Sequence, residues 1–512
     1  MLRKVLTESG CLLGTACGDP RVTCFKGVPY AAPPVGMLRW RPPQPAAAWE
    51  GVRNADTFPP VEIQVQPGSN PSDFYTKEMN PTGTECPMSE DCLYLNIWSP
   101  AKAADEKLPV YLWIHGGGMQ AGYSYEIEFG GEQMAKHGVI FITVGYRLNA
   151  FGFLAHPELT RETPGGCHGN YGLEDVVFAL KWIKRNIGAF GGDPSRVTIG
   201  GQSGGAFAVI ALSASPMVKG LISGAVAESG GGLRAIGYGN KCTPLHTAEE
   251  YGREFLELLK VKSIQEARRL SAEAVYAAYH SMGMQFERWS PTIDGVFLRE
   301  DATDAMLNDR HLRIPYLFGS NAGEYPGTPA APPPPETVEA FREQVRKMMG
   351  KDAEAFLKLC AVQTMEDVRR VIKTDAFNTR TISVRAYSRL QAQQKRTGYF
   401  YLFNHDVPGD DRPGPYHGSE MWYAFHSLDR CWRPFTGKDY DLAGQMCAYW
   451  ANFVKNGDPN GADINGRPLP EWHHYTEKDT FVMEFEDSAH RETKQIDPLT
   501  EFRLEKAGFP AR

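Results

Sequence analysis

Apolar positions in the first half of the chain fall into short continuous runs separated by stretches with helical spacing. The runs rich in β-branched residues cover 108–114, 139–146, 197–200 and 222–229. Continuous hydrophobicity, rather than alternation, is typical of strands that are covered on both faces. Between the second and third runs, apolar residues recur at helical spacing from Val176 to Ile187, and the pattern stops at Gly191. Strands that alternate with helices predict a mainly parallel sheet.

The second half of the chain combines amphipathic helices with further strands. We expect helices at 247–260 and 336–350, and strands at 314–320 and 398–404. The helices interrupt the strands, as insertions into a sheet would. The proline-rich segment 326–335 is brief, and strands resume after it, so an exposed loop is favoured over a domain linker. The expected fold is one α/β domain over residues 1–512, with a large, mainly parallel central sheet, flanking helices and helical insertions in the second half.

Composition excludes several classes of protein. Of 512 residues, 42% are apolar and 22% are charged, which is ordinary for a globular protein and excludes a disordered or fibrous chain. The net charge of -7 is spread without a basic block, so nucleic acid is not an expected partner. The sequence contains no window of about 18 uninterrupted apolar residues, so no membrane span is predicted. The first residues lack the apolar core of a signal peptide, so we expect a cytoplasmic protein.

The ten cysteines are too scattered for a disulfide-built scaffold or a zinc site. Cys86 and Cys92, in the stretch CPMSEDC, are the closest pair of interest. Two free thiols are the favoured interpretation for a cytoplasmic chain, and a disulfide between them stays open. No metal and no cofactor are expected.

The stretch GQSGG at 201–205 is the candidate for a nucleophile. A serine hydroxyl needs a base and must be held clear of the backbone, and glycines two residues before and after it allow a sharp strand-to-helix turn. This pattern occurs once in the chain, follows the apolar run 197–200 and opens into a helix-compatible segment. We therefore expect Ser203 to be a nucleophile rather than a small residue in a turn.

A second glycine-rich element, WIHGGGMQAG at 113–122, follows another apolar run. Three consecutive glycines leave backbone N–H groups free to approach a ligand, as an oxyanion hole requires. Coupled to a serine elbow about ninety residues downstream, an oxyanion hole is favoured over a plain flexible turn.

Spacing alone does not identify the base and the orienting acid. In this type of site the chain order is serine, acid, histidine. His417 lies in a Gly- and Pro-rich loop after a strand, but spacing alone leaves His405 and His426 open as bases. Glu324, in LFGSNAGEYPG, follows a strand as an orienting acid would, although an ordinary surface glutamate fits the same pattern.

At this point the sequence resembles the type-B carboxylesterase family, the cholinesterase-like branch of the α/β-hydrolases, through nearly the whole chain. The shared stretches lie at 25–45, 89–100, 113–118, 145–154, 169–205, 319–324 and 416–425.

The resemblance implies roles that spacing leaves open. It matches Ser203 to the nucleophile, Glu324 to the acid of a G-x-N-x-x-E motif and His417 to the base of an H-G-x-E motif. It matches three further residues to the oxyanion donors: Gly117, Gly118 and Gly204. It also matches Ser229 to a serine beside the triad, and Arg39 and Glu90 to a structural salt bridge near the rim of the site.

Several positions depart from the family pattern. Gln202 stands where many relatives have glutamate, and no tryptophan occurs between Trp49 and Trp98, so choline esters are disfavoured. Met119 stands where an aromatic residue is common, which implies a more adaptable pocket wall. The loop 64–85 is polar, which disfavours long-chain lipid interfaces.

The function expected from these observations is a serine carboxylesterase that hydrolyses small to medium esters through an acyl-enzyme. A feruloyl or other aromatic-acyl esterase is the alternative, with an aromatic pocket lined by Trp289, Tyr325, Met421 and Trp422, although core packing is favoured for at least two of these. A non-catalytic binding protein of the same family is a further alternative, but it predicts a missing triad residue. The expected partner is a small-molecule ester.

Overall fold

The computed structural model of the chain describes residues 1–80, 86–230, 242–283, 286–324, 335–493 and 495–510. Within this part, thirteen strands form one sheet in the order β1-β2-β3-β5-β7-β6-β8-β9-β12-β13-β14-β15, with β4 paired to β2. The strands of this sheet are β1 (Lys4–Leu6), β2 (Cys11–Ala16), β3 (Thr23–Pro29), β4 (Val52–Ala55), β5 (Tyr94–Ser99), β6 (Leu108–Ile114), β7 (Ile140–Val144), β8 (Gly192–Gln202), β9 (Gly224–Glu228), β12 (Tyr316–Asn321), β13 (Gly398–Phe403), β14 (Met483–Phe485) and β15 (Ala489–Arg491).

The centre of the sheet is parallel and its ends are antiparallel. All neighbours from β7 to β14 in the sheet order pair in parallel. A second, two-stranded parallel sheet joins β10 (Thr243–Pro244) to β11 (Thr292–Ile293). Because parallel strands have their carboxyl ends at the same edge, residues that follow β8, β9, β12 and β13 are brought together there.

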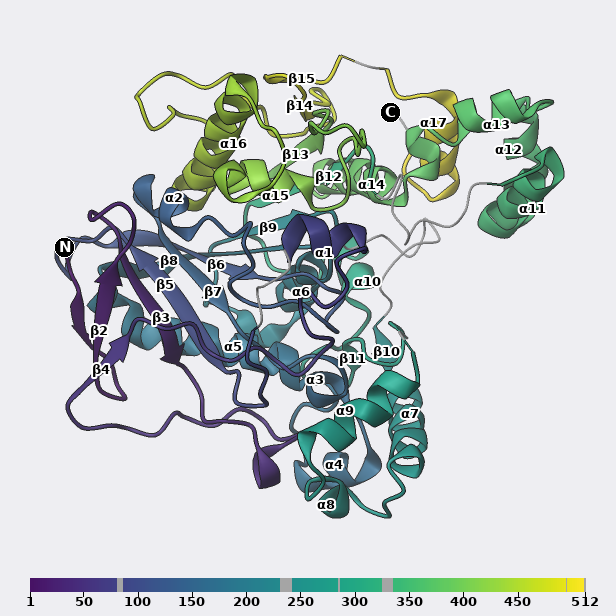
Figure 1. The fold of residues 1–512 in the computed structure, drawn as a ribbon. Helices are drawn as coiled ribbons and strands as arrows, with labels where there is room; N and C mark the ends of the chain where they lie inside the picture. The colour runs from purple at the N-terminus through teal and green to yellow at the C-terminus, as the bar shows by residue number, and fades with distance from the viewer. Residues whose placement is uncertain (81–85, 231–241, 284–285, 325–334, 494, 511–512) are drawn as a thin grey trace.

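Helices surround the sheet (Figure 1). They are α1 (Phe74–Met79), α2 (Gly131–Lys136), α3 (Asn149–Phe153), α4 (Pro157–Glu162), α5 (Tyr171–Asn186), α6 (Gly204–Ala214), α7 (Leu245–Leu258), α8 (Ile264–Ala267), α9 (Ala272–Ser281), α10 (Ala302–Leu307), α11 (Val338–Met349), α12 (Ala353–Cys360), α13 (Met365–Val371), α14 (Thr379–Gln393), α15 (Ser419–Ala424), α16 (Gly437–Asn456) and α17 (Pro498–Lys506).

The alternation of side chains along the strands builds a core on each face of the sheet. Leu112 and Ile114 of β6 pack in the cluster that contains α5, α6 and α14. Tyr111 and Trp113 of the same strand pack in the cluster that contains α2, α15 and α16. Both faces are therefore buried, which explains why these strands read as continuous apolar runs.

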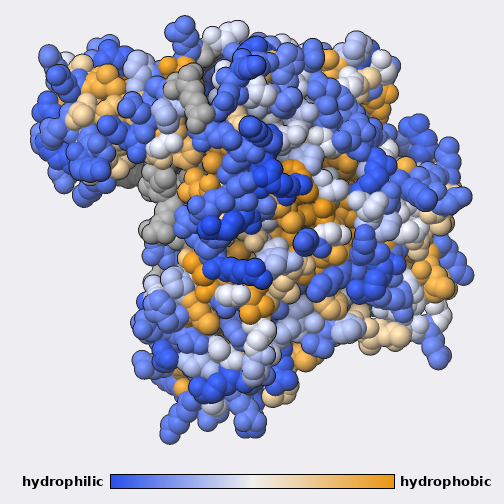
Figure 2. Space-filling view, turned by 180° about the vertical axis from the view of Figure 1, so that it is seen from behind, coloured by the Kyte–Doolittle hydropathy of each residue, from blue (hydrophilic) through white to orange (hydrophobic). Residues whose placement is uncertain are grey.

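The helical insertions form two outlying groups. Helices α7, α8 and α9 lie beside the small sheet, and α11, α12 and α13 pack with α17 around a separate apolar cluster (Figure 1). On the face turned away from the viewer in Figure 1, hydrophilic side chains predominate and apolar ones gather in the middle (Figure 2).

The expected elements agree with the structure to within a few residues at their ends. The predicted strands correspond to β6, β7, β8, β9, β12 and β13, and the predicted helices to α5, α7 and α11. The proline-rich segment 326–335 lies outside the described residues except for Pro335. Cys86 and Cys92 are not joined by a disulfide, in agreement with the favoured interpretation. None of the helices in the described part combines the length and apolarity that a bilayer crossing requires.

Candidate active site

Ser203 is the single residue between the end of β8 and the start of α6, where the chain turns sharply. Its φ of 56° and ψ of -118° are unusual for a residue with a side chain, and its N–H donates to the carbonyl of Glu228 at 2.8 Å. A Cβ on Gly205 would lie 2.1 Å from the carbonyl oxygen of Ile114, and one on Gly201 would lie 2.5 Å from the backbone of Gly205. The two flanking glycines are therefore required for the turn, which holds a partly exposed Ser203 at the sheet edge.

Positive φ angles outside glycine recur at this edge of the sheet. Besides Ser203, they occur at Met119, Ser229 and Glu324, with φ of 61°, 50° and 43°. Such conformations cost about 1 to 3 kcal/mol each and cluster at functional sites. Ser203, Ser229 and Glu324 follow β8, β9 and β12, which are neighbours in the sheet.

The structure brings His417 and Glu324 into direct contact. Nδ1 of His417 lies 2.5 Å from Oε2 of Glu324, and the His417 N–H donates to the Glu324 carbonyl. Oε1 of Glu324 accepts a hydrogen bond of 3.1 Å from the Asn321 N–H. The contact fixes one ring nitrogen of His417 on the acid and leaves Nε2 as the proton acceptor.

Burial and neighbouring charges have opposing effects on the pKa values of Glu324 and His417. Burial alone would raise the pKa of Glu324, but the imidazole of His417, the guanidinium of Arg380 and the Asn321 N–H outweigh it and hold the pKa below its usual range. Burial and Arg380 lower the pKa of His417, and Glu324 offsets this only in part. The site therefore favours a neutral imidazole beside an ionised carboxylate, the state that a general base requires.

Gln202 connects the histidine to the serine turn. Its Nε2 lies 3.4 Å from Nε2 and 3.5 Å from Nδ1 of His417, so the amide rests against the ring. Within the described chain, Oγ of Ser203 makes no hydrogen bond to His417 or to another residue. Catalytic hydrogen bonds are often long without substrate, and the contact through Gln202 places the imidazole next to the turn.

The glycine triplet lies against the same turn. Gly117 and Gly118 have φ of 87° and 64°, and a Cβ on Gly204 would lie 2.6 Å from the Gly118 nitrogen and 3.0 Å from the Met119 nitrogen. The N–H groups of Gly117, Gly118 and Gly204 donate to no residue of the described chain. Backbone donors without a protein partner close to a serine are what an oxyanion hole requires.

Ser229 belongs to a second hydrogen-bonded group behind the acid. Its hydroxyl donates to Oε1 of Glu420 at 3.0 Å, and the side-chain amide of Asn321 donates to the other oxygen of Glu420. Burial and the charge of Glu324 raise the pKa of Glu420 to about 7. Asn321 and Glu420 were not predicted as site residues, although each is a named position of the two quoted motifs, G-x-N-x-x-E and H-G-x-E.

The other two candidate bases have different partners. His405 is fully buried and bonds Asp439 of α16 at 2.7 Å through Nε2. The ring of His426 stands edge-on to that of Tyr440, also on α16, with centroids 6.3 Å apart. Of the three histidines that spacing left open, the structure brings His417 to the acid.

Two of the possible pocket residues lie in the core, the role that was favoured for at least two of them. Trp289 is 1% exposed and packs against Phe255 and Tyr279, and Trp422 is fully buried between the sheet and α16. Trp289 lies in a turn and Trp422 on the short helix α15, and local sequence does not reveal that both side chains pack in the core. Tyr325 lies outside the described residues.

The remaining pocket predictions lie close to the site but are buried. Met421 is 4% exposed, and its Cε lies 3.3 Å from where a Cβ on Gly418, the residue after His417, would sit. Met119 is 2% exposed and contributes its backbone to the glycine loop. A residue that sequence reasoning missed is Phe286, half-exposed, whose ring would meet a Cβ on Gly118 at 2.4 Å.

The loop expected to be polar over 64–85 contains the short helix α1 in its described part. The ring of Tyr75 stands edge-on to that of His417 with centroids 6.5 Å apart, and Phe74 packs on Tyr416 at 5.0 Å. The sulfur-bound methyl of Met79 reaches Gly418. Apolar side chains of this mainly polar loop therefore lie beside the histidine.

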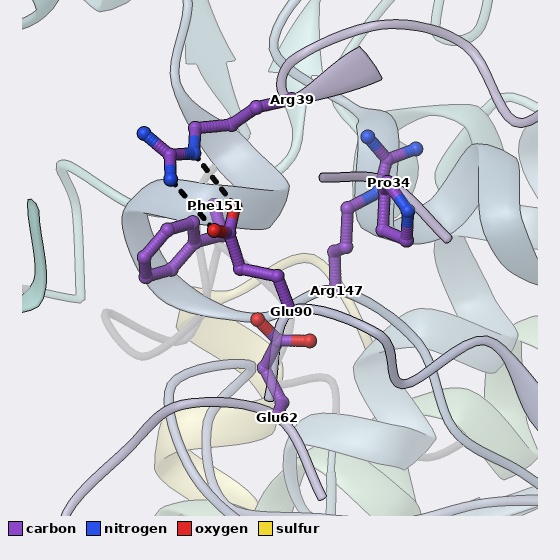
Figure 3. A pocket seen from close by; sticks show the side chains of 6 residues that line it. All are labelled: Pro34, Arg39, Glu62, Glu90, Arg147 and Phe151. Carbon is purple, nitrogen blue, oxygen red and sulfur yellow. Dashed lines mark hydrogen bonds and ion pairs between the residues drawn. The ribbon is translucent and has the colours of Figure 1, made fainter. Parts of the chain in front are cut away.

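The salt bridge between Arg39 and Glu90 is present, and nothing in the described part of the structure assigns it to the rim of the site. Two hydrogen bonds of 2.6 Å join the guanidinium to the carboxylate, and both side chains are buried. They line a small polar cavity with Pro34, Glu62, Arg147 and Phe151 (Figure 3). Ion pairs fill its wall and no triad candidate lines it, so this cavity is structural.

Among the described residues no group of three or more His, Cys, Asp or Glu side chains is arranged to hold a metal.

Comparisons with known proteins identify the family of the chain. Residues 2–500 match the model of the carboxylesterase family. The chain is 34% identical to a fumonisin B1 esterase of Sphingopyxis macrogoltabida, covering 89% of this chain and 82% of that protein. It is 32% identical to a cocaine esterase of Oryctolagus cuniculus, covering 90% and 88%. Among solved structures, a carboxylesterase of Geobacillus stearothermophilus matches with a TM-score of 0.77 at 30% identity, covering 99% of this chain and all of that one. A PNB esterase matches with a TM-score of 0.80 at 26% identity, covering 99% of both.

Proposed function

The chain belongs to the carboxylesterase family, and from this premise we propose that Ser203, His417 and Glu324 are its catalytic triad. The protein has the α/β-hydrolase fold and is a carboxylic ester hydrolase. The observation that carries the residue assignment is the 2.5 Å contact between His417 and Glu324, next to the strained turn that presents Ser203. We also propose that residues 1–512 act as one domain.

The reaction we propose assigns one role to each of these groups. Nε2 of His417 takes the proton of Ser203 while Oγ attacks the ester carbonyl, and Glu324 holds the ring in the required tautomer and stabilises its positive charge. The N–H groups of Gly117, Gly118 and Gly204 receive the developing oxyanion, each contributing about 3 kcal/mol to transition-state stabilisation. The imidazolium then protonates the leaving alcohol.

The second half of the cycle uses the same groups. Water enters, gives its proton to His417 and attacks the acyl carbon, and the acid is released as Ser203 is restored.

The substrates we propose are small to medium carboxylic esters. The aromatic-acyl alternative depended on an aromatic pocket, and two of its expected walls, Trp289 and Trp422, are core residues. Half-exposed Phe286 beside Gly118 leaves one aromatic contact near the reacting carbonyl.

The test compares two serines of one segment. Ser203→Ala should abolish hydrolysis of p-nitrophenyl butyrate, whereas Ser213→Ala, a buried serine of α6, should retain it. Hydrolysis retained by a purified Ser203→Ala protein overturns the assignment. A rate panel of short acyl esters, a long acyl ester, a feruloyl ester, cocaine and fumonisin B1 then ranks the substrate classes.

A further inference from the structure

A cation stands directly behind the triad acid. Nε of Arg380 lies 3.7 Å from Oε2 of Glu324, the oxygen that also contacts His417, and donates to the Ser229 carbonyl at 2.7 Å. The Arg380 side chain is 10% exposed. The guanidinium therefore bridges the ends of β9 and β12 and lies beside the same carboxylate oxygen that contacts the imidazole.

The backbone around Arg380 is held firmly against the acid's own strand. Asn378, which caps α14, donates from Nδ2 to the carbonyls of Asn321 and Ala322 at 3.0 Å each. Its Oδ1 accepts from the N–H groups of Arg380 and Thr381. The start of α14 is thus fixed to the end of β12, and the guanidinium has a defined place.

Other ionisable groups face the His417–Glu324 pair from several elements. They are Glu228 at the end of β9, Glu420 on α15, Tyr75 and Glu78 on α1, and Tyr416 beside the histidine. Burial raises the pKa of Glu228 and Glu420, which favours their neutral forms. Glu78 forms an ion pair with Arg433, whose guanidinium donates to both of its oxygens. Within the described chain, Arg380 is the cation found within 4.0 Å of the triad acid.

We propose that Arg380 is a positioning residue that holds Glu324 as a carboxylate and keeps the Glu324–His417 pair from taking up a proton in mildly acidic solution. The inference rests on the proposed triad. It adds a role that none of the matched motifs contains, because Arg380 lies 56 positions from the acid and 37 from the base in the sequence.

The expected direction does not depend on where the proton binds. A proton taken up by either His417 or Glu324 adds positive charge next to the guanidinium, so Arg380 opposes both. Without the cation, the pair takes up its proton at higher pH and the acidic limb of kcat/KM moves upward. A residue with a merely structural role would lower the rate at every pH and leave the limb in place.

The experiment uses the full chain in three variants. Arg380→Gln should move the acidic limb of kcat/KM for p-nitrophenyl butyrate to higher pH, with the ratio of the rates at about pH 6 and about pH 8 falling roughly twofold or more. Arg380→Lys retains the charge and should stay close to the unmodified protein. Arg385→Gln, on the same helix, removes a buried ion pair with Asp375 and Glu492 and should not move the limb.

A second measurement keeps the proposal testable if only part of the Arg380→Gln protein folds. The rate constant for inactivation by a neutral fluorophosphonate has the same acidic limb and does not depend on the folded fraction of the sample. An unmoved limb in Arg380→Gln, by either measurement, overturns the role of Arg380. If Ser203→Ala remains active, the triad itself fails; if Ser203 is labelled while the limb stays fixed, only the role of Arg380 fails.

Discussion

Replacing Gly117 by alanine should disable catalysis while leaving the fold. A Cβ at this position would lie 2.1 Å from the Ala121 carbonyl oxygen, whereas ordinary contacts begin at 3.4 Å. Because the obstacle is backbone, the glycine loop must move by more than about 1 Å, and shifts of that size at a reacting centre cost about 10²-fold in rate.

The magnitude follows from the donor that the shift removes. Loss of one oxyanion donor lowers kcat by about 10²- to 10³-fold, or about 3 to 4 kcal/mol of transition-state stabilisation. Alanine at a φ of 87° also costs the fold about 1 to 2 kcal/mol. The catalytic loss should therefore greatly exceed the loss of stability.

The assay pairs hydrolysis of p-nitrophenyl butyrate with thermal unfolding. Gly138→Ala is the matched control, since Gly138 has a φ of 80° but open space around its Cβ position. The control should lose comparable stability and no activity. A folded Gly117→Ala protein whose kcat stays within about threefold of the unmodified protein would refute the reasoning, because the displaced N–H would then not serve the transition state.

Three further substitutions follow from single observations. Gln202→Glu puts a carboxylate against the ring of His417, so the acidic limb of kcat/KM should move to higher pH and choline esters should gain relative to neutral esters; unchanged profiles and ratios would count against the contact. Burial raises the pKa of Glu174 to about 8, so the folded chain keeps a proton that the unfolded chain releases, and stability should fall as pH rises from about 5 to about 8. Glu174→Gln should weaken that fall in urea unfolding at about pH 6 and pH 8, by roughly 1 to 4 kcal/mol at the higher pH, and an unaltered slope would contradict the account. Phe286→Ala should raise kcat/KM for bulky acyl esters relative to acetate, and an equal change for both would show that the ring does not limit the acyl group.

The sequence predicted the sheet well because its strands are buried on both faces. The run 108–114 coincides with β6, and the serine turn follows β8 as expected. These features are local: a continuous apolar run, a glycine on each side of a serine, a helix pattern ending at glycines. Where the periodicity was clear, the structure differs only at element ends.

The histidine could not be chosen by spacing, because its pairing is not local. His417 and Glu324 lie 93 positions apart and meet only because β12 and β13 are parallel neighbours in the sheet. His405 also follows β13 directly, yet its side chain lies on the far face against α16. The resemblance to a family resolved what the residues alone left open.

The sequence did not reveal which of the residues near the motifs face the core, although core packing was favoured for at least two of them. Trp289 and Trp422 stand near motifs in the sequence but face the core, whereas Phe286, three positions before Trp289, lies at the glycine loop. Arg380 carries no signal in the sequence at all, since its contact with Glu324 is created by the way α14 packs against β12.

The most direct test of the central claim is the site of covalent modification by a fluorophosphonate. Trypsin places Ser203 in peptide 197–219 and Ser229 in peptide 220–234, so mass spectrometry separates the two serines. The account predicts one adduct per chain, on Ser203, formed in step with the loss of esterase activity. An adduct on Ser229 or elsewhere, with Ser203 unmodified in the inactivated protein, would contradict it.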